Sequence, residues 1–121
     1  MFLIDVSIQA DILNLLKQLQ QVMGLTFLFI SHDLSVVAHT CDYVAVMYLG
    51  RLVEVAPTRK LFAAPRHPYT KALFSAIPSL NPEAAVKAQK LEGEIPSPTN
   101  MPVGCKFHSR CQHAIDDCRV T

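Results

Sequence analysis

Hydrophobic residues recur at steps of three and four near the start of the chain, the spacing of one face of an α-helix. Glutamine, asparagine and lysine fill the opposite face, and the apolar face comprises Ile8, Ile12, Leu15, Leu16, Leu19, Val22 and Met23. The pattern predicts an amphipathic helix from about Ser7 to Met23. Gly24 is typical of the residue that ends such a helix.

A nearly all-apolar run, Leu25–Ile30, follows at once and predicts a strand buried on both faces. A helix leading directly into such a strand indicates an α/β protein. The run ends in Ser31, His32 and Asp33, and Leu34–Thr40 has the pattern of a short helix with Ser31 or Asp33 as its N-cap. Ligands of open parallel sheets bind at the carboxyl ends of strands, so His32 is placed to contact a phosphate. The alternative is a strand-end histidine held by local hydrogen bonds.

Two more strands, Tyr43–Leu49 and Arg51–Ala56, are predicted as a hairpin that turns at Gly50. Short helices are predicted after Pro57 and over Pro68–Ala76, because proline suits the first helical position.

Prolines and small polar residues between Pro78 and Pro102 predict an extended connection, in which only Glu83–Lys90 has helical character. The first helix has no preceding strand, so the element order resembles the last part of a larger α/β domain.

Composition narrows the function classes. With 121 residues the chain suits one small domain. A net charge of +1 gives no electrostatic footprint for nucleic acid. No apolar run approaches the roughly 18 residues of a membrane span. The first residues lack the pattern of a signal peptide, so we expect a cytosolic chain.

Thiols in a cytosolic chain point to metal or core roles rather than disulfides. The cysteines are Cys41, Cys105, Cys111 and Cys118. Cys41 is expected in the core. The other three, separated by five and six residues, do not have the C-x-x-C spacing of common zinc or ferredoxin sites. Spacing alone leaves three alternatives open: a thiolate site of unidentified metal, zinc shared with His108 and His113, or no metal.

Five segments resemble, in order, the C-terminal third of the ATP-binding subunits of dipeptide and oligopeptide ABC importers, a branch that includes nickel and glutathione importers. They are Asp5–Ala10 at the D-loop, Ile30–Leu34 at the switch-histidine loop, Val44–Arg51 at the strand pair beyond it, Arg66–Leu73, and Pro102–Cys118 at the cysteine-bearing extension. The resemblance implies an α/β fold with two parts. Residues 1–64 would be the C-terminal part of an ABC nucleotide-binding domain of the P-loop NTPase type, and residues 65–121 an irregular, Pro-rich, cysteine-bearing extension.

The same resemblance implies an ATP-hydrolysing subunit that uses ATP and magnesium to power peptide import. His32 would contact the γ-phosphate as a catalytic residue, with Ser31 beside it. Asp5 would bind at the nucleotide as the D-loop aspartate, although an aspartate near a helix start is also a common cap. The resemblance favours a 4Fe-4S cluster on Cys105, Cys111 and Cys118, with a fourth cysteine beyond Thr121.

Partners implied by the resemblance are a second ATP-binding subunit, transmembrane permease subunits and, indirectly, a peptide-binding protein, with no nucleic acid. The location implied is the cytoplasmic face of the inner membrane, as a peripheral protein. The cargo is not encoded in such a subunit.

The chain also departs from the family pattern. The phosphate-binding loop (Walker A), the signature sequence and the acidic pair of Walker B do not occur in it, and Phe2–Ile4 stand where the family has Ser-Ala-Leu. We therefore expect this chain alone to be inactive. Two other interpretations remain: a metal-binding interaction module, and a non-functional truncated fragment.

Overall fold

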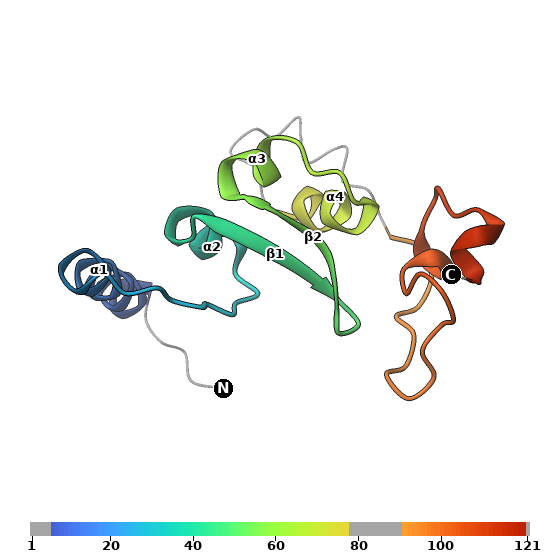
Figure 1. Cartoon of the computed structure of the whole chain (residues 1–121), viewed down its shortest axis with the longest axis horizontal. Helices are drawn as coiled ribbons and strands as arrows, with labels where there is room; N and C mark the ends of the chain where they lie inside the picture. Colours follow the sequence, from blue (N-terminus) through green and yellow to red (C-terminus); the bar gives the residue numbers. More distant parts are fainter. Residues whose placement is uncertain (1–5, 78–90, 121) are drawn as a thin grey trace. The chain divides into compact units, whose positions relative to one another are not determined.

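The computed structural model describes residues 6–77 and 91–120 and forms two compact units, residues 1–41 and 42–121. The first unit contains α1 (Val6–Met23) and α2 (Leu34–Thr40) (Figure 1). The elements of the second are β1 (Tyr43–Tyr48), β2 (Arg51–Pro57), α3 (Thr58–Ala63), α4 (Pro68–Ser75) and the 3-10 turns η1 (His108–Arg110) and η2 (Asp116–Arg119). Within the described ranges, none of the helices has both the length and the apolar character that a bilayer crossing requires.

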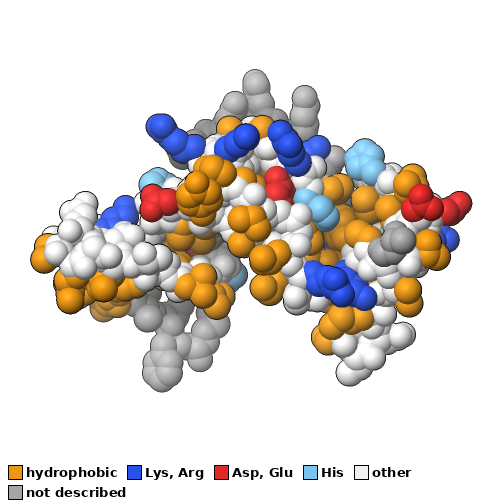
Figure 2. Space-filling view, in the orientation of Figure 1, with side chains coloured by type: hydrophobic (Ala, Val, Ile, Leu, Met, Phe, Trp, Pro, Cys, Tyr) orange, Lys and Arg blue, Asp and Glu red, His pale blue; other side chains and the backbone are white. Residues whose placement is uncertain are grey.

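The predicted first helix is confirmed, with α1 beginning one residue earlier than expected. Its apolar face is open to solvent: Ile12 is 47% exposed and Leu15 55%. Figure 2 shows hydrophobic side chains gathered on the surface over this helix. Lys17 Nζ donates a hydrogen bond to the backbone carbonyl of His39 at 2.8 Å, which ties α1 to α2.

The predicted buried strand at Leu25–Ile30 is wrong for this chain. The run has no regular secondary structure, and Leu28 and Ile30 are 92% and 90% exposed. A strand exists through hydrogen bonds to a neighbouring strand. The sheet formed by the described residues contains only β1 and β2, so this run has no such neighbour. Its apolar sequence therefore matches an environment that the described residues do not provide.

The predicted hairpin is confirmed. β1 and β2 pair antiparallel, and the side chains of Val44, Val46 and Tyr48 alternate into the core while the residues between them face solvent. Leu49 and Gly50 form the two-residue turn with φ of 46° and 74°. Two positive φ angles in succession match the twist of the flanking strands.

Both short helices of the second unit are also confirmed, and Figure 1 shows α3 and α4 on one side of the hairpin. Leu61 of α3 is fully buried. Phe62 stacks on Phe74 with ring centroids 4.4 Å apart, which joins α3 to α4. Tyr69 of α4 lies 4.7 Å from Tyr48 of β1, so the helix pair covers the apolar face of the hairpin.

Residues 91–120 form a tail that is irregular apart from the two 3-10 turns. The side chain of Phe107 packs this tail against β1 and α4. This side chain is 1% exposed, with ring centroids 5.2 Å from Tyr48 and 5.6 Å from Tyr69. The α/β class is thus confirmed. The helical character expected over Glu83–Lys90 lies outside the described residues, and the domain boundary at residues 64 and 65 stays a prediction.

Candidate functional site

The Ser31–Asp33 loop is organised by side chains that bond to its own backbone. Asp33 is the N-cap of α2: its Oδ1 accepts from the backbone N–H of Ser35 at 3.0 Å and of Val36 at 3.3 Å. Ser31 Oγ accepts from the backbone N–H of Asp33 at 3.0 Å. Of the two predicted caps, Asp33 is therefore the one that is formed.

His32 lies between these two engaged residues, and its side chain is exposed. Because Ser31 and Asp33 hold the backbone on either side, the imidazole is presented at the surface and is not packed into a core. An imidazole N–H can donate a hydrogen bond, which suits contact with a phosphate. Asp5, the other nucleotide-binding residue expected, lies outside the described residues.

A second polar centre, at Glu54, was not expected from the sequence. The Glu54 carboxylate accepts from the backbone N–H of Arg66 and of His67, both at 2.9 Å, just before α4. His67 is the N-cap of α4, and its Nδ1 accepts from the backbone N–H of Tyr69 at 3.1 Å. The signal that could have revealed this centre is a lone carboxylate in the otherwise apolar run 52–57.

The pKa values at this centre follow from these contacts. Burial raises the pKa of Glu54, but the N–H groups of Arg66 and His67, with smaller contributions from Thr70 and the His67 charge, bring it below its ordinary value of 4.5. Burial lowers the pKa of His67 below its ordinary value of 6.5, and the negative charge of Glu54 reverses only part of that effect. The centre is therefore most stable as a carboxylate beside a neutral imidazole.

Backbone hydrogen bonding brings two of the three tail cysteines together. The N–H of Cys105 donates to the carbonyl of Cys118 at 2.9 Å. Gly104, with φ of 73°, makes this approach feasible, because a Cβ there would lie 2.6 Å from the Cys118 carbonyl oxygen. Cys111 follows η1, and all three thiols are free and half-buried.

In their present arrangement the tail cysteines do not form a metal site. In the part of the chain that the structure describes, no three His, Cys, Asp or Glu side chains are grouped as metal ligands. A 4Fe-4S cluster or a zinc ion would therefore require Cys105, Cys111 and Cys118 to move closer together. Cys41, expected in the core, is half-buried at the C-cap of α2.

Comparison with known proteins places the chain in a family. Residues 53–118, more than half of the chain, match the family model described as the oligopeptide/dipeptide transporter, C-terminal region. A protein of Brucella ovis that carries the provisional name of a peptide import ATP-binding protein is 58% identical over 98% of this chain and 37% of its own length. The dipeptide transport ATP-binding proteins of Haemophilus influenzae and Escherichia coli are 53% and 54% identical.

These two proteins are matched over 96% and 95% of this chain but only 36% and 34% of their own lengths. The chain thus spans about a third of the curated relatives it matches, in their C-terminal portion. The resemblance seen in the sequence motifs is confirmed. The chain belongs to the family of the oligopeptide/dipeptide transporter C-terminal region.

Proposed function

We propose that this chain is the C-terminal part of an ATP-hydrolysing subunit that powers peptide import by an ABC transporter. The observation that carries the proposal is the identity of more than half to peptide and dipeptide import ATP-binding proteins along nearly the whole chain. The exposed His32 on a capped loop supports it, because that geometry leaves the imidazole accessible to a nucleotide.

In this proposal the sheet that would flank Leu25–Ile30 belongs to a nucleotide-binding domain of the P-loop NTPase type. The exposed, unpaired apolar run supports the idea, since its composition is that of a strand buried on both faces. ATP and magnesium are the proposed cofactors of the full-length protein. A second ATP-binding subunit and transmembrane permease subunits are the proposed partners, with a peptide-binding protein as an indirect partner.

The proposed catalytic role of His32 is to donate a hydrogen bond to the γ-phosphate as charge develops on it. Phosphoryl transfer is catalysed mainly by positioning and electrostatic stabilisation, so one well-placed donor has a large effect. Ser31 is the neighbouring nucleotide-binding residue, and its Oγ–H stays available to donate while the oxygen accepts from Asp33. Asp5 is proposed to act at the subunit interface of the nucleotide-binding dimer.

The test replaces His32 by alanine in a full-length protein that carries this segment. Turnover of ATP should fall roughly 100-fold, while nucleotide affinity changes little, because the lost interaction forms mainly in the transition state. Phosphate release and nucleotide binding are measured separately. His39→Ala, at another exposed histidine in α2, is the matched control and should keep normal turnover. Turnover of the His32 variant within twofold of the parent would contradict the proposal.

The 4Fe-4S cluster remains a proposal for a longer protein only. Its support is the presence of three cysteines in one tail, two of them joined by a backbone hydrogen bond. The described arrangement does not bring their thiols together as ligands. We therefore assign no function of this chain to a cluster.

A further inference from the structure

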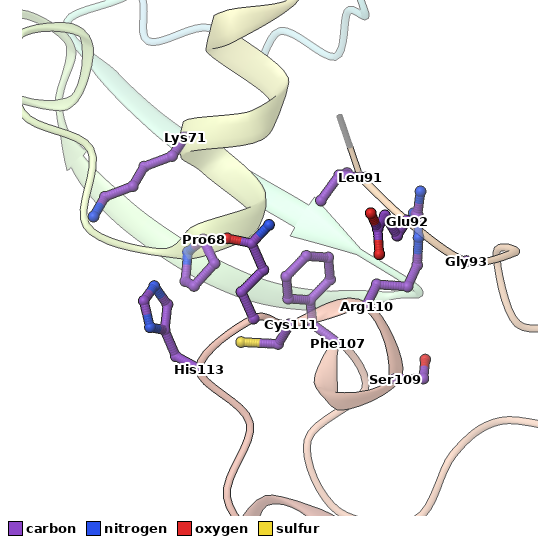
Figure 3. A pocket seen from close by; sticks show the side chains of 11 residues that line it. Pro68, Lys71, Leu91, Glu92, Gly93, Phe107, Ser109, Arg110, Cys111 and His113 are labelled. Carbon is purple, nitrogen blue, oxygen red and sulfur yellow. The ribbon is translucent and has the colours of Figure 1, made fainter. Parts of the chain in front are cut away.

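A cavity of about 280 Å³ lies between the start of α4 and the irregular tail. Figure 3 shows Phe107 at its centre, with Arg110 and Glu92 on one side and Lys71 and His113 on the other. All of these residues belong to the second compact unit. Neither the Ser31–Asp33 loop nor Glu54 lines this cavity, so neither explains it.

Arg110 is the feature that points to a ligand. Its Nε lies buried with no hydrogen-bond partner among the described residues. Buried polar groups in folded proteins are almost always paired, and a charged donor left unpaired is especially unfavourable. Gly93 packs against the same side chain, since a Cβ built there would lie 3.7 Å from Arg110 Cγ. The Nε atom is therefore buried and unpaired beside a cavity, in a side chain that is half-buried as a whole.

The residues that line the cavity indicate which kind of ligand could pair with Arg110. Arg110 and Lys71 outnumber the single carboxylate of Glu92, so the lining carries net positive charge. A planar guanidinium matches the geometry of carboxylate and phosphate oxygens. Leu91 is half-buried and adds apolar surface, whereas the Phe107 side chain is 1% exposed and is already covered by neighbours such as Tyr48. Apolar surface beside a cationic group suits a ligand with an anionic head and an apolar body.

We propose that this cavity, referred to as the Arg110 pocket, binds a small organic oxyanion, a carboxylate or a phosphate ester. The oxyanion accepts a hydrogen bond from Arg110 Nε. The carbon part of the ligand packs on Leu91, and Lys71 adds long-range attraction at the rim. This site contains no residue of the Ser31–Asp33 loop, and it gives the tail a binding role that does not depend on a metal.

The test uses the whole chain, labelled with ¹⁵N, and three probes that share one aromatic ring. Benzoate carries a carboxylate, phenyl phosphate carries a phosphate, and benzyl alcohol carries no charge. We expect a saturable shift of the Arg110 Nε–H resonance with at least one of the anions and none with benzyl alcohol. The anion that binds more tightly identifies the head group.

Variants assign the binding to the pocket. Arg110→Gln should lower the affinity for the preferred anion at least 10-fold. The affinity of this variant is measured from the shift of the backbone amide resonance of Gln112. Arg119→Gln, an exposed arginine of the same tail outside the pocket, should stay within twofold of the native affinity. If the Arg110 variant does not fold, Lys71→Gln replaces it in the test, and its affinity for the preferred anion should fall about threefold at low salt. The proposal is overturned if neither anion binds, if benzyl alcohol binds as tightly, or if the pocket variants match the Arg119 control.

Discussion

Single side chains that bond to the backbone decide much of the local structure of this protein. Asp33 caps α2 and His67 caps α4. The role of Asp33 could be predicted because aspartate at a helix start is a local signal. The role of Glu54 could not be predicted. Its partners, the backbone N–H groups of Arg66 and His67, are 12 and 13 residues away, and only the fold brings them together.

Replacing Glu54 by glutamine tests this centre. At pH 7 the variant should lose about 1–2 kcal/mol of unfolding free energy, because two backbone donors lose a charged acceptor. Urea unfolding followed by circular dichroism measures the change. Glu94→Gln, at an exposed glutamate, is the control and should be neutral. A Glu54 variant as stable as the native chain would show that the carboxylate does not stabilise the fold.

The same centre predicts how stability depends on pH. Because the pKa of Glu54 is lowered on folding, its contribution is complete above about pH 4.5 and is lost as the pH falls through the folded value. The pKa of His67 is lowered too, so the unfolded chain binds a proton first and stability declines as the pH drops below about 6.5. Unfolding free energy measured from pH 8 to pH 3 should fall below about pH 6.5 and again below about pH 4.5, and the second fall should be less steep in Glu54→Gln.

At the scale of elements, the β-hairpin contains a turn that its sequence does not optimise. Leu49 adopts φ of 46°, a left-handed conformation in which a side chain costs energy, whereas asparagine is well suited to it. Leu49→Asn should therefore stabilise the second unit by about 0.5–1 kcal/mol. Gly50→Ala, with φ of 74° and no steric neighbour, should destabilise it by about 1 kcal/mol. Thermal unfolding of both variants checks this prediction, and shifts of the same sign would contradict it.

The run 25–30 shows where prediction of elements from sequence fails. Its composition indicates a buried strand, but a strand also needs a neighbour, and the described residues provide none at this run. The composition of a segment indicates whether it is suited to a buried environment. Hydrogen-bonded pairing with another strand, in contrast, depends on residues distant in sequence. The hairpin was predicted correctly because both of its strands and its turn lie within one short stretch.

An exposed run of this kind should drive self-association. Unpaired backbone groups next to apolar side chains favour pairing with another chain. The isolated chain is expected to exceed the mass of a monomer in light scattering after size exclusion, increasingly with concentration. The double substitution Leu28→Lys and Ile30→Lys should restore a monomer, because both side chains are almost fully exposed. Val103→Lys, at an exposed valine of the tail, should not. A native chain that stays monomeric would contradict the prediction.

For the whole molecule, the α/β class and most elements could be predicted, whereas the packing of the tail could not. Cysteine spacing drew attention to a metal, yet the residue that anchors the tail is Phe107. An aromatic residue in an irregular segment has no periodicity to reveal its burial. The Arg110 pocket could not be predicted for a similar reason, because its lining residues come from α4 and from two separate stretches of the tail, 91–93 and 107–113.

The last prediction concerns metal binding by the cysteine tail. Thiolates suit iron–sulfur clusters and zinc, but a 4Fe-4S cluster normally takes four protein ligands, and the tail has three cysteines. Cys41 is a poor fourth ligand, because it is held at the C-cap of α2, directly before β1. After anaerobic reconstitution we expect little iron or sulfide in this chain, and a complete cluster in a longer protein that supplies a further cysteine past Thr121.

Iron and sulfide analysis with visible absorption measures both proteins. In the longer protein Cys111→Ser should abolish the cluster, whereas Cys41→Ser should leave it intact. Because the described thiols are not grouped as ligands, binding would also require the tail to rearrange, and circular dichroism should change as the metal is loaded. A full cluster in the 121-residue chain would contradict the ligand count. Zinc in place of iron in the longer protein would overturn the cluster assignment, and no metal in either protein would leave the three cysteines with a packing role.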